Sequence, residues 1–257
     1  MSTVISRDGT SIAYERTGDG WPVILVGGAL NDGPAGEPFA ELLAPHFTVF
    51  TYDRRGRRAS GDTPPYAVAR EVEDLEAVIE EAGGTASVCG LSSGGALVLE
   101  AAAAGLSIAK SAVFEVPYAL DWGHRDRTAD YGNELARLLA AGDRGGALTL
   151  FMRYAGAPDA MIDEARRSPF WPGLEELAPS LAYDAAVMGD GMLPVGRLGA
   201  VGVPTLVIDG GDSPRWLREA SRAIAAAIPG GRQHTVEGQT HDVSPGALTT
   251  VLREYFS

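Results

Sequence analysis

The sequence predicts a doubly wound α/β fold, in which helices cover both faces of a mostly parallel sheet. Short apolar runs rich in β-branched residues recur along the 257 residues, and such runs are typical of strands buried on both faces. Helix-like segments lie between several of these runs, and this alternation favours parallel pairing. With 45% hydrophobic and 21% charged residues, the chain can bury one large core.

The elements follow in a simple order. The first 20 residues indicate an antiparallel hairpin that turns at Asp8 and Gly9. The later strands are expected at 23–26, 47–52, 86–88, 111–114, 205–208 and about 233–236. Helices are expected at 71–81, 95–104, 215–227 and 245–256, and the last is introduced by Ser244 as N-cap and Pro245 at the first helical position.

One block, residues 118–198, interrupts the alternation because it contains helix-like stretches and no convincing strand. It holds eight of the 19 aromatic residues and four of the five methionines. We therefore predict a core formed by 1–117 and 199–257, and a helical lid at 118–198 inserted before the last strands. Lid side chains either pack the lid onto the sheet or line an apolar substrate pocket. The better pocket candidates are Trp122, Phe151, Trp171, Tyr183 and Met188.

Composition excludes several classes of partner. The formal net charge of −13 disfavours nucleic acid and anionic membranes, which would repel the chain. A single cysteine, Cys89, leaves no internal disulfide and is typical of a cytoplasmic protein, and no signal peptide or membrane-spanning run is expected. No metal-ligand cluster or nucleotide-binding glycine pattern is visible, so we expect no metal and no cofactor. The expected partner is a small-molecule substrate, and the expected assembly is a monomer or homodimer.

The motif with the most chemical content is Gly90-Leu91-Ser92-Ser93-Gly94-Gly95. It lies between an apolar run and an Ala/Leu-rich segment, which predicts a strand, a tight turn and a helix in that order. This arrangement is a nucleophile elbow, whose strained central serine is exposed above the sheet. Glycines flank the serine because Cβ atoms there would clash. Ser92 is the predicted nucleophile.

A serine hydroxyl needs a base within hydrogen-bond reach, and the chain has four histidines. His46 is expected on a surface turn just before a strand, His124 in a polar stretch of the lid, and His234 inside the last strand. His241 follows that strand. Loops at the carboxyl ends of parallel strands share one edge of the sheet, so His241 is the histidine expected to meet Ser92.

Over essentially its full length the chain resembles the α/β-hydrolase superfamily. The resemblance depends on Gly27-Gly28-Ala29 after the third strand, residues 53–60 (DRRGRRAS) after the fourth, the elbow at Ser92, and His241 as the last motif. The GLSSGG elbow is similar to that of a group of small bacterial hydrolase-like proteins. In the family the 53–60 loop is structural, so the charges of its arginines are expected to face solvent or pair with nearby carboxylates.

The resemblance implies an oxyanion hole formed by the backbone N–H groups of Ala29 and Ser93. Gly27 stands where the family usually has histidine, which keeps the backbone donors and removes a side chain. Leu30 and Asn31 follow as expected pocket residues, and Asn31 is either an auxiliary donor or a turn residue.

The triad acid has more than one candidate. Relatives commonly place an aspartate three residues beyond a glycine after the late strand, a position held here by Ser213, with Asp212 one residue short. Other members place the acid after the strand that follows the elbow helix, where this chain has Glu115. The resemblance favours Glu115 slightly over Asp212, with Asp209 third, and leaves open that no acid is present.

These residues predict a serine hydrolase that cleaves an ester, lactone or thioester of a small, largely apolar substrate through an acyl-enzyme. The alternative is a hydrolase scaffold used for cyclisation or carbon–carbon bond chemistry on a secondary metabolite, or for small-molecule binding.

Overall fold

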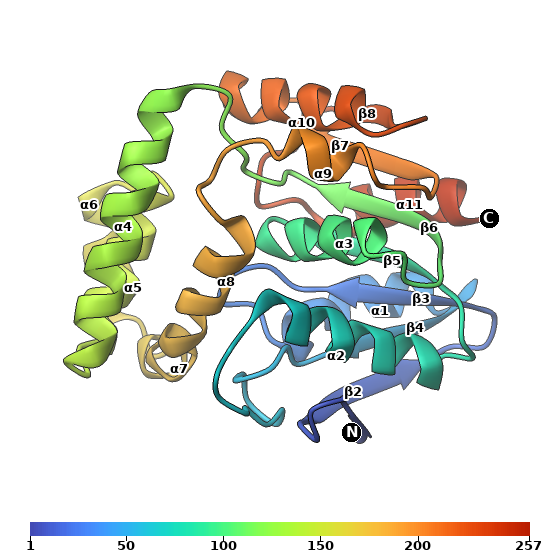
Figure 1. Cartoon of the computed structure of the whole chain (residues 1–257), viewed down its shortest axis with the longest axis horizontal. Coiled ribbons are helices and arrows are strands. Elements are labelled where there is room, and N and C mark those ends of the chain that lie inside the picture. Colours follow the sequence, from blue (N-terminus) through green and yellow to red (C-terminus); the bar gives the residue numbers. More distant parts are fainter.

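The computed structural model describes the backbone of residues 1–257 and the side chains of 1–121 and 125–257. Its centre is an eight-stranded sheet with the order β1-β2-β4-β3-β5-β6-β7-β8 (Figure 1). β1 pairs with β2 and β2 with β4 in antiparallel fashion, and every later pairing is parallel. The strands are β1 (Ser2–Ile5), β2 (Ser11–Thr17), β3 (Trp21–Val26), β4 (Phe47–Tyr52), β5 (Ala86–Leu91), β6 (Ile108–Phe114), β7 (Thr205–Gly210) and β8 (Arg232–Val236).

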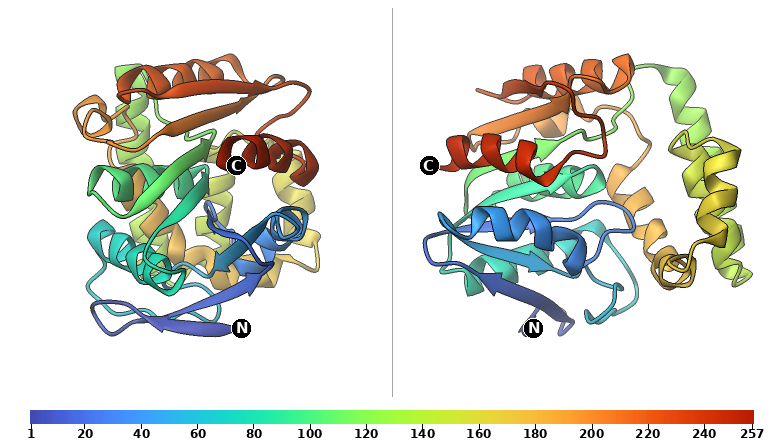
Figure 2. Two further views of the ribbon diagram at one scale, coloured as in Figure 1. Left: turned by 90° about the vertical axis from the view of Figure 1, so that its right-hand side faces the viewer. Right: turned by 180° about the vertical axis from the view of Figure 1, so that it is seen from behind.

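Helices cover both faces of the sheet, as Figure 2 shows from two further directions. One face packs against α2 (Val68–Glu81), α3 (Ser93–Ala103) and α10 (Arg215–Ala227), and the other against α1 (Glu37–Leu43) and α11 (Pro245–Phe256). Central strands such as β4 are buried along their whole length, which explains their mostly apolar sequence. The doubly wound, mostly parallel fold class predicted from the sequence is confirmed.

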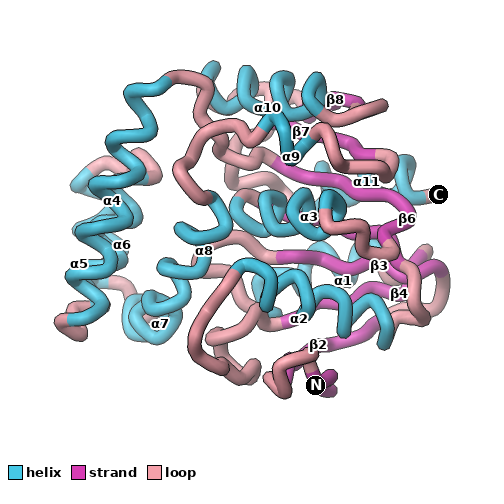
Figure 3. The backbone as a smooth tube through the Cα atoms, viewed as in Figure 1, coloured by secondary structure: helices cyan, strands magenta, loops and turns pink.

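A helical insertion between β6 and β7 stands beyond the carboxyl ends of the parallel strands, whose direction the arrows of Figure 1 give, and Figure 3 shows it as a group of helices beside the sheet. It has a core of its own, which includes Leu135, Leu148 and Leu181. Its helices are α4 (Trp122–Ala140), α5 (Arg144–Tyr154), α6 (Asp159–Arg167), α7 (Trp171–Leu177), α8 (Leu181–Met188) and α9 (Val195–Leu198), with a short 3-10 turn η2 (Ala178–Ser180).

Some helices, among them α1 and α6, were not expected from the sequence. α1 follows a 3-10 turn, η1 (Gly33–Gly36), in a stretch whose glycines and prolines indicate a loop, and it buries only Ala40 and Leu43. α6 lies in the insertion and buries a single residue, Ile162. Among the described residues, no helix combines the length and the apolar character that crossing a membrane requires.

Candidate active site

Ser92 lies on the elbow between β5 and α3, with φ +53° and ψ −124°. This strained backbone is held by a hydrogen bond from the Ser92 N–H to the Phe114 carbonyl (2.8 Å). A Cβ on Gly90 would lie 2.5 Å from the Gly94 oxygen, and one on Gly94 would lie 2.5 Å from the Gly27 oxygen. Backbone atoms cannot give way as a flexible side chain can, so both glycines are required for the tight turn.

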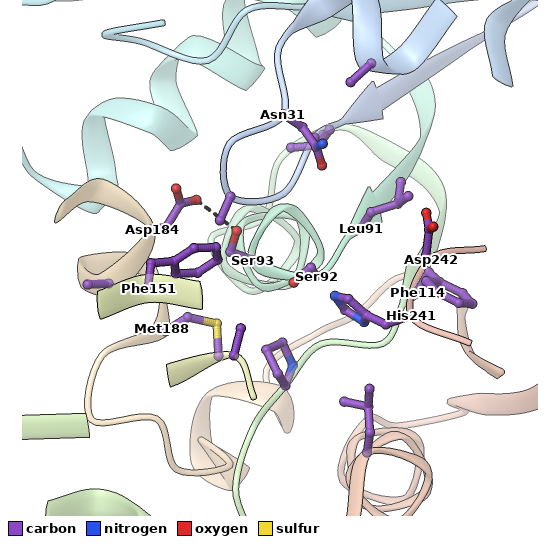
Figure 4. Close-up of a pocket in the computed structure, with 18 of the residues that line it drawn as sticks. Asn31, Leu91, Ser92, Ser93, Phe114, Phe151, Asp184, Met188, His241 and Asp242 are labelled. Atoms are coloured by element: carbon purple, nitrogen blue, oxygen red, sulfur yellow. Dashed lines mark hydrogen bonds between the residues drawn. The ribbon is translucent and has the colours of Figure 1, made fainter. Parts of the chain in front are cut away.

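His241 and Glu115 meet at the same edge of the sheet. His241 is in the loop after β8, and Glu115 follows β6 directly with φ +47°. The Glu115 side chain is fully buried, and its Oε2 lies 2.9 Å from His241 Nδ1. Its Oε1 accepts a hydrogen bond from the Gly210 N–H at 2.8 Å, which fixes the carboxylate. In Figure 4 Ser92 and the His241 ring lie next to each other in the pocket.

The Glu115 contact sets the tautomer of His241. A carboxylate accepts hydrogen bonds, so Nδ1 carries the proton and Nε2 is left as an acceptor. Within the described residues no hydrogen bond joins Ser92 to His241. Such hydrogen bonds often tighten only when substrate is bound.

The other histidines and carboxylates weighed from the sequence lie elsewhere. His46 and His234 are exposed before β4 and within β8, and the His124 side chain is outside the described residues. Asp212 was a candidate for the acid, but its side chain is exposed and makes no hydrogen bond or ion pair with His241 in the described part of the chain. Asp209 is buried, but it accepts hydrogen bonds from Gln233 and Thr235 on β8 instead of meeting the histidine.

The loop after β3 approaches Ser92 from the other side. A Cβ on Gly28 would lie 3.1 Å from the Ser92 Cβ, so the loop backbone is in close contact with the elbow. Ala29 and Ser93 both line the cavity around Ser92, and in the described part of the chain neither backbone N–H donates a hydrogen bond. A Cβ on Gly27 would lie 3.0 Å from the Asn31 Cβ, so Asn31 occupies the space that a larger residue at 27 would need.

The sequence left open whether the charges of the arginines in the 53–60 loop face solvent, and for three of the four the structure shows that they do not. Arg54, Arg55 and Arg57 are at most 2% exposed, and only Arg58 reaches the surface. The alternative expectation, pairing with carboxylates, describes them. Arg54 pairs with Glu71 and Asp184, Arg55 with Asp8 and Asp74, and Arg57 with Asp184.

Asp184, on α8 of the insertion, is a site residue that the sequence analysis missed. It lines the cavity, and its Oδ1 accepts a hydrogen bond from the Ser93 hydroxyl at 2.8 Å (Figure 4). Burial acts to raise the pKa of Asp184, but the charges of Arg57 and Arg54 outweigh it and hold the pKa below its usual value. Nothing in the sequence around Asp184 signals this position, because its partners are about 90 to 130 residues away along the chain.

A cavity of about 1120 Å³ surrounds Ser92 and reaches from the sheet edge into the insertion. Of the expected pocket residues, Asn31, Phe151 and Met188 line it. The insertion adds aromatic residues that were not anticipated, Tyr131 and Tyr154, whose rings stack at 4.2 Å. Most of the lining is apolar, and Asp184, Asp242 and Arg125 are among its charged members.

Three other expected pocket residues do not line the cavity. Leu30 and Trp171 pack into the core of the insertion, where Trp171 is 8% exposed. Tyr183 stacks on Tyr66 and donates its hydroxyl hydrogen to Asp62. Their aromatic or apolar character serves packing, which sequence alone does not distinguish from pocket lining. The Trp122 side chain lies outside the described residues.

Over the described ranges, no three side chains of histidine, cysteine, aspartate or glutamate gather as a metal ion would require.

Comparisons with known proteins agree on one family. A model of the alpha/beta hydrolase family matches residues 18–247. The crystal structure of an alpha/beta hydrolase from Sphaerobacter thermophilus is 52% identical, covers 100% of both chains and superposes with a TM-score of 0.92. A thermophilic esterase from Thermogutta terrifontis shares the fold, with a TM-score of 0.74 at 22% identity over 99% of this chain and 97% of that one. A protein of Azorhizobium caulinodans named RutD, a provisional carbamate hydrolase, is 28% identical over 90% of this chain and 88% of its own length.

Proposed function

We propose that this chain, which belongs to the alpha/beta hydrolase family, is a serine hydrolase that cleaves esters, lactones or thioesters through an acyl-enzyme. The observation that carries the proposal is the pairing of His241 Nδ1 with the buried Glu115 at 2.9 Å, beside the strained elbow that presents Ser92. These groups come from three separate loops at one edge of the sheet. Nucleophile, acid and histidine follow one another along the chain in the order typical of this fold.

The reaction follows from the roles of these groups. His241 Nε2 takes the proton of the Ser92 hydroxyl as Oγ attacks the substrate carbonyl, and Glu115 stabilises the imidazolium that forms. The N–H groups of Ala29 and Ser93 hold the oxyanion of the tetrahedral intermediate, each contributing about 3 kcal/mol. Collapse of the intermediate expels the leaving group, which takes the proton from His241. Water, activated by the same histidine, then releases the acyl group and restores the Ser92 hydroxyl.

The cavity supports a largely apolar substrate. Phe151 and Met188 of the insertion and Phe114 of the sheet present carbon-rich surfaces around Ser92. The insertion in this proposal acts as a lid that shields the acyl-enzyme from water. At about 1120 Å³ the cavity accepts acyl groups well beyond acetyl. A carbamate should be tested as a substrate beside esters, lactones and thioesters, because the Azorhizobium protein is named as a carbamate hydrolase.

An activity-based probe tests the proposal directly. A fluorophosphonate should label wild type once, at Ser92, and p-nitrophenyl butyrate should be hydrolysed. Ser92→Ala should abolish both signals, and His241→Gln should lower both at least about 100-fold. His234→Gln is the matched control, because this exposed histidine on β8 lies outside the site.

A folded wild type that is neither labelled nor active on any ester, lactone, thioester or carbamate would refute the proposal. That outcome would leave the non-hydrolytic or ligand-binding alternative.

We also infer a cytoplasmic enzyme acting on a small diffusible substrate, as a monomer or homodimer. The single cysteine is free and buried, and the formal charge of −13 disfavours polyanionic partners.

A further inference from the structure

Arg57 has contacts that pairing with a carboxylate does not explain. One terminal nitrogen, Nη2, donates to both oxygens of Asp184 at 3.0 and 2.8 Å. The other, Nη1, donates to the carbonyls of Gly28 (2.6 Å) and Asn31 (2.7 Å). The side chain is 1% exposed, so solvent does not screen these hydrogen bonds. Arg57 therefore joins the insertion to the loop that approaches Ser92.

The Gly28 carbonyl and the Ala29 N–H belong to the same peptide group. A trans peptide is planar, and its C=O and N–H point in opposite directions. The Gly28 oxygen also accepts a hydrogen bond from the Asn31 N–H at 3.2 Å, and the shorter one from the Arg57 guanidinium adds to it in fixing the direction of the Ala29 N–H on the other side. That N–H has no partner among the described residues and belongs to a residue that lines the cavity.

A charged donor on the carbonyl also polarises the peptide, which makes its N–H a stronger donor. The neighbouring Asp184 compensates the charge of Arg57. The influence of Arg57 on the site is therefore limited to the peptide group with which it forms a hydrogen bond. Asp184 also accepts the hydrogen bond from the hydroxyl of Ser93, the residue that carries the second proposed oxyanion donor. One buried ion pair thus contacts both halves of the proposed oxyanion hole.

The buried Arg55 offers a contrast within the same loop. Its Nε, Nη1 and Nη2 all donate, to Asp74, Asp8 and the Arg70 carbonyl, and none of these partners lies in the loop after β3. The Nε of Arg57, by comparison, is buried without a partner in the described part of the chain. An unpartnered buried N–H lowers the stability of the fold. Arg57 therefore occupies a less favourable place than Arg55, and stability alone does not account for it.

We propose that Arg57 is a positioning residue for the transition state, which orients and polarises the Gly28–Ala29 peptide so that the Ala29 N–H meets the developing oxyanion. The inference depends on the proposed serine hydrolase function. Arg57 does not line the cavity, so it acts through the peptide and not by touching substrate.

The test compares Arg57→Met, Arg57→Lys and the matched buried control Arg55→Met with wild type. Each is assayed for kcat and KM on p-nitrophenyl butyrate and for the affinity of an alkyl trifluoromethyl ketone. This ketone forms a tetrahedral oxyanion adduct with the active serine. Arg57→Met should lower kcat about 10- to 100-fold. This fall is no larger than the fall in kcat expected when a whole oxyanion donor is removed. KM should stay within about two-fold, and the affinity for the ketone should fall by the same factor as kcat/KM.

Arg57→Lys should lie between wild type and Arg57→Met, because an ammonium can donate to Gly28 but cannot also bridge Asp184 in the planar geometry of a guanidinium. Arg55→Met should lower the melting temperature but keep kcat within about two-fold, because its partners are remote from the loop.

The inference is overturned if a folded Arg57→Met keeps both kcat and the affinity for the ketone, or if Arg55→Met lowers them equally. Should Arg57→Met not fold, Arg57→Lys decides: a parallel loss of kcat and ketone affinity supports the inference, and wild-type values overturn it. A wild type that neither hydrolyses the ester nor binds the ketone would overturn the proposed function, and the inference with it.

Discussion

The substitution Glu115→Gln tests whether the Glu115 carboxylate sets the tautomer of His241, with little change in the shape of the side chain. The Gly210 N–H donates to Oε1 at 2.8 Å, so a glutamine would keep its carbonyl oxygen in that place and turn its NH₂ toward His241. Nδ1 would then have to accept a hydrogen bond, and the ring proton would move to Nε2. That tautomer cannot take the proton of Ser92. Loss of the correct tautomer in a comparable triad lowers kcat about 10⁴-fold, which corresponds to about 5.5 kcal/mol.

The full effect is expected here because Glu115 is completely buried, and water cannot replace the lost carboxylate. Steady-state kinetics on p-nitrophenyl butyrate should therefore show a fall in kcat of about 10³- to 10⁴-fold with KM almost unchanged. Asp212→Asn is the matched control, since this exposed carboxylate lies after β7 at the other position considered for the acid. The reasoning is wrong if Asp212→Asn reduces kcat strongly while Glu115→Gln, folded by circular dichroism, retains it.

Three further outcomes are expected. Gly94→Ala should lower the free energy of unfolding by about 2–3 kcal/mol in urea, because its Cβ would lie 2.5 Å from the Gly27 oxygen; unchanged stability would contradict the packing of the elbow. Trp171→Ala should lower the free energy of unfolding by about 3–5 kcal/mol and leave KM unchanged, because Trp171 fills the core of the insertion. Phe151→Ala should raise KM, because Phe151 lines the cavity. The reverse pattern would show that Trp171 lines the substrate pocket and Phe151 fills the core. Burial raises the pKa of the Cys89 thiol to about 12, so a disulfide reagent at pH 8 should label it only in guanidinium, and stoichiometric labelling of native protein would refute its burial.

The fold was predictable because its signals are local. Apolar β-branched runs, helical periodicity and the glycines around Ser92 each depend on neighbours within a few residues. Elements that escaped prediction, such as α1 and α6, bury few of their own side chains. A helix or strand that depends on tertiary contacts more than on its own sequence pattern cannot be predicted from the sequence.

The site was predictable only in part. Ser92 and His241 follow from motif and topology, and both line the same cavity. For the loop arginines the sequence left two alternatives open, solvent exposure or pairing with carboxylates, and the structure shows the second, with Arg57 buried against Asp184. Their pairing joins positions 127 residues apart, which no local pattern records.

The sequence by itself determined the order of strands and helices, the tight turn that presents a serine, and the edge of the sheet at which its partners gather. Only the tertiary structure decided which carboxylate reaches His241, because Glu115 and Asp212 both follow strands and differ in where their loops carry them. It also decided which apolar side chains face the cavity and which fill the core of the insertion. The physical reason is the same in both cases: backbone pattern is set by near neighbours, whereas the partner of a side chain is set by packing between segments far apart in the chain.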